Sequence, residues 1–357
     1  MEKQMNQKSN SSKKSKYRRR LAALSVCLLG LLFTGCAGSQ KEQGTTGQQA
    51  TEEAPDVPGQ QEPEAAADAA GQQVEAFTPT IVKEDVDLPG YEGSCDLLFV
   101  ADLHIVEKDD PDVAADQMET VNQRHTAFSN GYGASAEYWK KLAPAIDGLE
   151  ADYVLFCGDM VDYCSESTVK HLKEGLDQIK TPWMYVRADH DLASWYAENG
   201  TPEEAWRLQD TAGPNEAVMT ADVGEDLRII GWNDSTSQMT AEAAEHMKQE
   251  LQKARDEKKT VVLLTHVPLY TEMDEEMAEL SRQAWQDRVL CWGANCYHWP
   301  DANTAAGLQE ILAEESPVEL VLTGHVHYDH EGMLTEKIRQ YTFAPCYGDR
   351  VTLLHIH

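Results

Sequence analysis

The chain has 357 residues, of which 30 are basic and 61 acidic, and its formal net charge is −31. Nucleic acids are bound by basic surfaces, so this excess of acidic residues disfavours a nuclease or another protein that binds a phosphate backbone. The length allows one large domain or two ordinary ones.

The first 35 residues have the pattern of a secretory signal. A basic segment over residues 13–20 precedes an apolar run over residues 21–33, which is short for a transmembrane helix. The run ends in Phe33-Thr34-Gly35-Cys36, which resembles the lipobox of bacterial lipoproteins, with Phe33 where Leu is usual. We therefore predict a lipoprotein signal peptide over residues 1–35 and lipidation of Cys36. An ordinary signal peptide or an uncleaved anchor is the alternative.

Residues 36–79 are predicted to form a disordered, acidic tether that begins at the lipidated Cys36. They are rich in Gln, Glu, Gly, Ala and Pro and contain almost no large apolar residue before Val74. Such a segment cannot bury enough apolar surface to offset the entropy lost on ordering. Without residues 1–35, 22 basic and 60 acidic residues are left, a formal charge of −38. This charge disfavours contact with anionic lipid beyond the anchor itself.

From about residue 80, β-prone apolar runs alternate with amphipathic helical segments, which predicts one α/β domain over residues 80–357. Strands are predicted over residues 96–101, 153–157, 183–187, 218–223, 227–232, 261–265, 318–323, 341–343 and 351–356. Helices are predicted over residues 135–146, 167–179, 240–258, 274–289 and 303–313. Pro144 is expected to kink the first helix, which follows a long polar stretch.

The segment over residues 153–162 is central to this domain. Its first five residues form an apolar run typical of a strand buried on both faces, and Gly158 ends the run. Asp159 and Asp162 follow, at the end of the strand where α/β proteins place their sites. A helix cap after the strand is the alternative explanation, because Asp is common at that position.

Four other predicted strands are also followed by Asp or His. The side chains that follow the five strands are Asp102, His104, Asp159, Asp162, Asp189, His190, Asp191, His266, His325 and His327. Alternate residues of an extended chain face the same side, so Asp-x-His and His-x-His can each direct two side chains at one ion. Imidazole and carboxylate without thiolate suit Mn, Zn, Fe or Ni. About seven ligands suit two ions that share a carboxylate.

The motif set of the calcineurin-like metallophosphoesterases is similar to five segments of this chain, taken in order. They are Asp102-x-His104, Gly158-Asp159-x-x-Asp162, Ala188-Asp189-His190-Asp191, His266 and Gly324-His325-x-His327. The resemblance implies a four-layer sandwich, with two mixed β-sheets flanked by helices. It also implies two divalent or mixed-valence metal ions and hydrolysis of phosphomonoesters or phosphodiesters.

The resemblance further implies a role for each motif residue. Asp102, His104 and His327 would hold the first ion, and Asp159 would bridge the two ions. Asp189, His266 and His325 would hold the second ion. His190 would be the general acid that protonates the leaving oxygen, and Asp162 would orient its imidazole.

The chain departs from the family pattern at one motif, where the family has Gly-Asn-His and this chain has Ala188-Asp189-His190. Aspartate can bind a metal, but it adds negative charge where the substrate phosphate must lie. We expect weaker phosphate binding, a preference for a monoanionic diester, or a trivalent second ion. Asp189 is also expected to raise the pKa of His190 and so favour its acid form.

Four cationic side chains are candidates for contact with the substrate phosphate: Arg187, Arg288, Arg124 and His125. For each of them, a surface or structural role is the alternative. Trp285, Trp292, Tyr297, His298 and Trp299 could line the site or pack in the core. Cys95 and Cys157 are expected to be buried, and Cys291 could form a local disulfide with Cys296.

These features predict a hydrolase of phosphoesters at the outer face of the cell membrane, attached only through its N-terminal lipid. The alternative is a lipoprotein that binds a phosphorylated ligand or a metal without turnover. The natural substrate, the metals and the oligomeric state stay open.

Overall fold

The computed structural model describes residues 77–197, 200–234 and 238–357. The predicted signal peptide, the predicted lipidation site Cys36 and residues 37–76 of the predicted tether lie outside these described residues. Within the described ranges, no helix combines the length and the apolar character needed to cross a bilayer.

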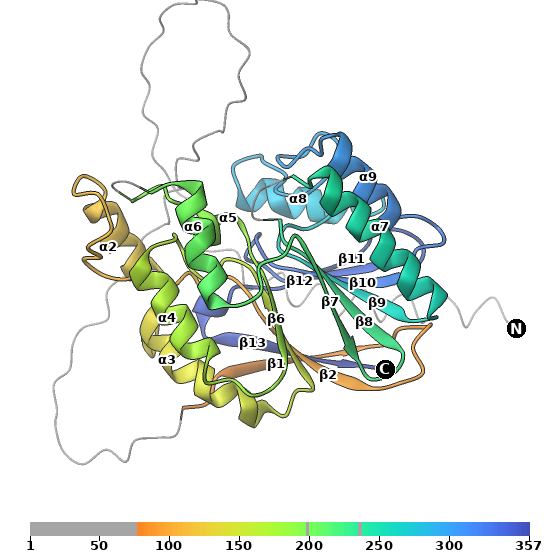
Figure 1. The fold of residues 1–357 in the computed structure, drawn as a ribbon, viewed down its shortest axis with the longest axis horizontal. Coiled ribbons are helices and arrows are strands. Elements are labelled where there is room, and N and C mark those ends of the chain that lie inside the picture. The colour runs from red at the N-terminus through yellow and green to blue at the C-terminus, as the bar shows by residue number, and fades with distance from the viewer. Residues whose placement is uncertain (1–76, 198–199, 235–237) are drawn as a thin grey trace, which may run out of the picture. The chain divides into compact units, whose positions relative to one another are not determined.

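The described chain builds two mixed β-sheets (Figure 1). The first sheet, in the order β1-β13-β2-β5-β6, contains β1 (Thr80–Val86), β2 (Cys95–Val100), β5 (Tyr153–Cys157), β6 (Trp183–Val186) and β13 (Arg350–Ile356). The second sheet, in the order β11-β12-β10-β9-β8-β7, contains β7 (Val218–Val223), β8 (Leu227–Trp232), β9 (Thr260–Thr265), β10 (Val318–Thr323), β11 (His330–Met333) and β12 (Arg339–Thr342). A short hairpin pairs β3 (Ser129–Asn130) with β4 (Gly133–Ala134).

The helices of the described residues lie between the strands in sequence. They are α2 (Met118–Ala127), α3 (Ser135–Ala145), α4 (Glu166–Leu176), α5 (Asp189–Leu192), α6 (Pro202–Gln209), α7 (Ala241–Asp256), α8 (Glu275–Ala284) and α9 (Ala302–Ile311). Single 3-10 turns occur at Ile146–Leu149, Asp210–Ala212 and Cys346–Gly348.

The strands that lead to the predicted site residues run parallel to one another within each sheet. In the first sheet β2 is parallel to β5, and β5 is parallel to β6. In the second sheet β9 is parallel to both β8 and β10. The carboxyl ends of parallel neighbours lie at the same edge of a sheet, so each sheet gathers its site residues at one edge.

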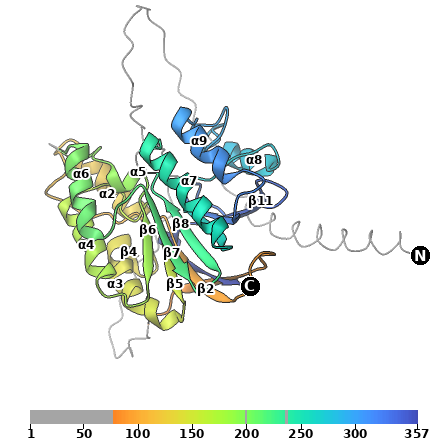
Figure 2. The ribbon, with the colours of Figure 1, turned by 45° about the vertical axis from the view of Figure 1, so that its right-hand side comes forward.

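Alternating side chains of the strands build the packed layers. Leu98 and Val100 of β2 pack with the helices α3 and α4, whereas Leu97 and Phe99 of the same strand pack against the second sheet. In the second sheet, Val261 of β9 belongs to a third buried cluster, which includes residues of α7 and α9. Figure 2 shows these two helix pairs on opposite sides of the paired sheets. The predicted four-layer sandwich is therefore confirmed.

Most predicted strands are present, but the sequence pattern missed several elements. The strand β1, the helix α2 and the strand β11 were not assigned, and α8 ends at Ala284 instead of residue 289. The folded part also begins before residue 80, because the ring of Phe77 packs edge-on against Tyr132 and Tyr138. All six described cysteines are free thiols, so the local bridge between Cys291 and Cys296 is not formed.

The contact between α3 and α4 leaves no room for a side chain at Gly175. Trp139 of α3 is fully buried, and its indole N–H donates to the carbonyls of His171 and Leu172 in α4, both at 3.1 Å. A Cβ atom added at Gly175 would lie 2.1 Å from the indole nitrogen of Trp139. The glycine therefore lets the two helices approach closely around a buried tryptophan.

We predict that Gly175→Ala lowers the free energy of unfolding by about 1–2 kcal/mol, because overpacking outweighs the better helix propensity of alanine. Urea denaturation monitored by circular dichroism measures the change. Gly148→Ala is the matched control, since no heavy atom lies within 4 Å of its added Cβ. Equal stabilities of the two variants would contradict the packing argument.

Candidate metal centre

The loops that follow β2, β5, β9 and β10 meet and are joined by main-chain hydrogen bonds. The Asp102 amide donates to the carbonyl of Gly158 at 3.1 Å, and the Gly324 amide donates to the carbonyl of His266 at 3.0 Å. The amide of His325 donates to the carboxylate of Asp102, with both oxygens at 3.2 Å. Both sheets therefore contribute to one site.

Five of the predicted site residues have a left-handed backbone, which is uncommon for residues other than glycine. They are Asp102 (φ 53°), His104 (φ 48°), Asp159 (φ 50°), His325 (φ 70°) and His327 (φ 59°). Such conformations cost on the order of 1–3 kcal/mol each and persist where the surroundings fix them. Their concentration here marks these loops as a candidate functional site.

Glycine is required at Gly158, the last residue before Asp159. Its φ is +75°, and an added Cβ would lie 2.6 Å from Nδ1 of His266 and 2.7 Å from Cβ of Ala188. The loops after β5, β6 and β9 can approach one another only because this position has no side chain.

The first group of possible metal ligands consists of Asp102, His104 and His327, whose ligand atoms all lie within 4.8 Å of one another. Nε2 of His327 is 3.1 Å from Oδ1 of Asp102 and 3.3 Å from Nε2 of His104. Asp102 and His104 are buried. The three side chains can therefore face a single ion.

The second group consists of Asp159, Asp189, His266 and His325, again with ligand atoms within 4.8 Å of one another. Oδ2 of Asp159 is 3.1 Å from Nε2 of His266 and 3.7 Å from Nε2 of His104 in the first group. Asp159 therefore lies between the two groups, where a bridging carboxylate is expected.

Hydrogen bonds fix which nitrogen of two buried imidazoles can bind a metal. Nδ1 of His104 donates to the Asp162 carboxylate at 2.9 Å, and Nδ1 of His266 donates to the carbonyl of Cys157 at 2.7 Å. Each Nε2 is then left with a lone pair, as in a metal-binding histidine oriented by its second nitrogen. The ring of Phe128 stacks on that of His104, with centroids 4.4 Å apart, and holds it in place.

Three buried polar atoms of the second group have no hydrogen-bond partner among the described residues. They are Oδ1 of Asp159, Oδ1 of Asp189 and Nε2 of His266. An unpaired buried polar group costs about 1–3 kcal/mol, and more when it is charged. A cation would satisfy all three, and carboxylate with imidazole suits Mn, Zn, Fe or Ni. The residues present fit a metal centre.

The carboxylate of Asp162 connects the first group to His190. It is fully buried and accepts hydrogen bonds from His104 and from Nε and Nη2 of Arg124. Burial alone would raise the pKa of Asp162, but the Arg124 guanidinium outweighs it and holds the pKa well below its usual range. Asp162 is therefore ionised, and its carboxylate oxygens are hydrogen-bonded to Arg124 and His104.

His190 is held beside this carboxylate with one nitrogen left over. Its Nδ1 donates to the main-chain carbonyl of Asp162 at 2.8 Å and lies 3.2 Å from Oδ1 of the same residue. Burial lowers the pKa of His190, but Asp159 and Asp162 outweigh it and raise the pKa to about 10. His190 can thus carry a proton on Nε2 at neutral pH.

The sequence model of the calcineurin-like phosphoesterases matches residues 96–329. The chain belongs to this family. No curated protein matches the chain.

Several solved structures have a similar chain path at low sequence identity. A dimetal phosphatase from Danio rerio is 11% identical with a TM-score of 0.44, and the match covers 70% of this chain and 87% of that one. A purple acid phosphatase, PPD1, from yellow lupin (Lupinus luteus) seeds is 14% identical with a TM-score of 0.43, covering 71% and 44%. PhoD is 10% identical with a TM-score of 0.39, covering 72% and 57%.

In this metallophosphoesterase, two of the side chains predicted to contact phosphate bind other protein groups instead. Arg187 is fully buried and donates to the carbonyls of Tyr185, Gln209, Gly213 and Pro214. It joins the end of β6 to the segment after α6, so the prediction that it clamps phosphate is wrong. Arg124 is paired with Asp162, which gives it a positioning role in place of the predicted substrate contact.

Arg288 and His125 stay predictions as substrate contacts. Arg288 is exposed, and its guanidinium carbon lies 5.5 Å from the ring centroid of Tyr297. His125 is half-buried on α2 and belongs to neither ligand group.

The structure adds two residues whose roles the sequence did not assign. Asp191 is buried, and its carboxylate accepts from the amides of Asp159 (2.8 Å), Val161 (3.0 Å) and Ala188 (2.9 Å), which joins the loops after β5 and β6. Its place in the segment Ala188-Asp189-His190-Asp191, directly after a strand, was the available signal. Nε2 of His298 lies 3.2 Å from Nε2 of His325, although the sequence placed His298 only in an aromatic wall or in the core.

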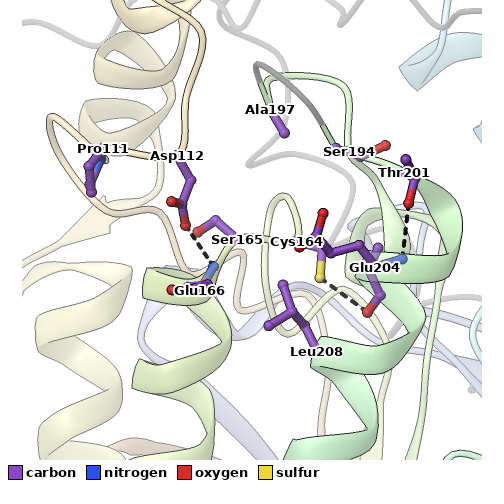
Figure 3. A pocket seen from close by; sticks show the side chains of 12 residues that line it. Pro111, Asp112, Cys164, Ser165, Glu166, Ser194, Ala197, Thr201, Glu204 and Leu208 are labelled. Carbon is purple, nitrogen blue, oxygen red and sulfur yellow. Dashed lines mark hydrogen bonds between the residues drawn. The ribbon is translucent and has the colours of Figure 1, made fainter.

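A separate cavity of about 230 Å³ lies beside the N-terminal end of α4 and α6 (Figure 3). Its described lining includes Cys164, which donates to the carbonyl of Ala205, and three acidic side chains, those of Asp112, Glu166 and Glu204. Neither ligand group contributes a residue, and no described lining residue is a Lys or an Arg. The cavity is thus poorly suited to an anionic phosphate.

The carboxylate of Asp189 is predicted to weaken phosphate binding. Two divalent ions carry four positive charges, and the carboxylates of Asp102, Asp159 and Asp189 neutralise three of them, so one positive charge is left. With asparagine at position 189, two positive charges would be left. The Asp189→Asn variant should therefore bind metal more weakly. It should bind inorganic phosphate about tenfold more tightly, which is the effect expected from removing one unit charge several ångströms from the phosphate.

Calorimetric titration of the metal-loaded protein with phosphate, together with metal analysis, measures both effects. Asp177→Asn, at an exposed position on the surface, is the control. Unchanged metal content together with unchanged phosphate affinity in Asp189→Asn would remove the charge argument.

Proposed function

We propose that this metallophosphoesterase hydrolyses phosphomonoesters or phosphodiesters with two metal ions. The observation that carries the proposal is the pair of adjacent ligand groups, with Asp159 between them and His190 beside them. The proposed ligands are Asp102, His104 and His327 for the first ion, Asp189, His266 and His325 for the second, and Asp159 for both. When bound, two such ions activate water for attack and neutralise charge on the phosphoryl oxygens.

His190 is the proposed general acid. Its Nδ1 is tied to the main-chain carbonyl of Asp162, so Nε2 is the nitrogen that can reach the leaving oxygen. It gives its proton to that oxygen as the bond from phosphorus to the leaving group breaks, and water restores the proton. Asp162 stabilises the protonated imidazole, and Arg124 keeps Asp162 ionised.

A second candidate function is binding of a phosphorylated ligand or a metal without turnover. Asp189 favours this alternative, because it places an additional negative charge where the phosphate must bind. Turnover measurements distinguish the two functions.

We predict that the protein hydrolyses p-nitrophenyl phosphate, bis(p-nitrophenyl) phosphate or both when loaded with Mn²⁺, Zn²⁺, Fe²⁺ or Ni²⁺. His190→Ala should lower kcat about 10²–10⁴-fold on alkyl phosphates, whose leaving oxygen needs a proton, and less on nitrophenyl esters. The activity on alkyl phosphates should fall as pH rises through the pKa of His190, which bound cations bring below its value of about 10 in the metal-free chain.

His246→Ala, which removes a partly exposed histidine of α7, is the control for this comparison. Asp159→Ala should abolish activity and metal binding together. Binding of phosphate without turnover under all four metals would favour the second candidate.

We further propose that the catalytic domain is held at the outer face of the cell membrane by lipid on Cys36. The support is the order of a basic segment, an apolar run and Phe33-Thr34-Gly35-Cys36, followed by a polar, acidic tether. An anchored enzyme would act on phosphoesters outside the cytoplasm.

Expression of the full chain in a bacterium that processes lipoproteins tests the anchor. Cys36→Ser should abolish labelling by radioactive palmitate and move the protein out of the detergent-soluble membrane fraction, because one residue carries the lipid. Cys27→Ser, within the apolar run, is the matched control and should stay labelled. Labelling that persists in Cys36→Ser would refute this proposal.

A further inference from the structure

Exposed aromatic side chains gather around the candidate metal centre. Among the described residues, the exposed large apolar side chains are Tyr132, Trp195, Met273, Tyr297 and Trp299. The ring of Trp195 lies 4.8 Å from that of His190, and the ring of Tyr297 lies 5.0 Å from that of His298. Trp299 directly follows His298. Two of these five side chains, Trp195 and Tyr297, therefore adjoin the site.

Core packing does not explain the position of Trp195. Its side chain is 40% exposed and belongs to none of the buried hydrophobic clusters of the described residues, whereas its neighbour Tyr196 does. Its described ring contacts are edge-to-face, with His190 at 84° and with Tyr196 at 83°. A large indole surface is thus left in solvent directly beside the proposed general acid.

The position of His190 determines which part of a substrate would meet this surface. Nδ1 of His190 is bound to the carbonyl of Asp162, so proton transfer must occur from Nε2 to the leaving oxygen. The organic group on that oxygen must then lie beside the imidazole. Trp195 is the exposed aromatic residue in contact with that imidazole.

We propose that Trp195 forms a subsite for a planar ring on the leaving group, such as a nucleobase or an aryl group. The inference rests on the proposed hydrolase function and adds a substrate class to it. Flat rings stack on indole through dispersion and quadrupole interactions, and an alkyl chain or a sugar without a base binds an indole face more weakly. The net charge of −31 disfavours a polynucleotide, so the expected substrate is a small phosphoester.

A matched pair of substrates isolates this contact. A nucleoside 5′-monophosphate and ribose 5-phosphate have the same leaving oxygen and differ in the base, and their methyl diesters extend the pair to a phosphodiesterase. The metal-loaded protein and its Trp195→Ala and Trp195→Phe variants are compared by kcat/KM on both members.

We expect Trp195→Ala to lower kcat/KM about tenfold for the nucleotide, which corresponds to about 1.4 kcal/mol, and to leave ribose 5-phosphate within twofold. Trp195→Phe should retain most of the preference, because it keeps a ring. Met273→Ala, which removes an exposed apolar side chain elsewhere, should change neither substrate.

Equal losses on the two substrates, or no loss on either, would overturn the subsite while leaving the hydrolase in place. Failure of the wild-type protein to hydrolyse any phosphoester with any of the metals would instead refute the proposed function, and the subsite with it.

Discussion

The ionised, buried carboxylate of Asp162 is the interaction on which the candidate site depends. It is fully buried, yet it accepts from His104 and Arg124 and lies 3.2 Å from His190. A charge taken so far out of water is tolerable only when it is paired and hydrogen-bonded. The same contacts fix the His104 tautomer and raise the pKa of His190. One carboxylate therefore connects the proposed ligand set to the proposed acid.

The fold must also support an arrangement of the ligand loops that is locally unfavourable. Five ligand residues have left-handed backbones, and the ligand oxygens of two carboxylates, those of Asp159 and Asp189, lie within 4.8 Å of each other. Two sheets with apolar layers on both faces hold these loops through their parallel strands. Main-chain bonds between loops then fix their ends, as between His104 and Asp159 at 2.9 Å. Stability of the sandwich thus offsets strain and charge repulsion at its edge.

The structure brings the predicted ligand residues together, but it gives two of the predicted substrate contacts, Arg187 and Arg124, other partners. Asp102 and His325 are 223 residues apart in the sequence and follow strands of different sheets, yet they lie in one site, as the motifs indicated. Arg187 lies between a strand and a site motif in the sequence, but its side chain is buried and donates hydrogen bonds to main-chain carbonyls. The direction of a side chain at a strand end depends on the neighbouring layers, which local sequence does not encode.

The sequence by itself determined an α/β domain and which carboxylates and imidazoles follow its strands, because apolar runs and short polar motifs are local patterns. The motifs also pointed to the family, and that resemblance implied the two-sheet architecture. Only the tertiary structure decided three contacts: the ion pair of Arg124 with Asp162, the contact of His298 with His325 and the ring contact of Trp195 with His190. Those contacts join loops from different strands, and their geometry is set by the packing of two sheets against each other. Long-range packing, which no local pattern specifies, therefore arranged the surroundings of the site.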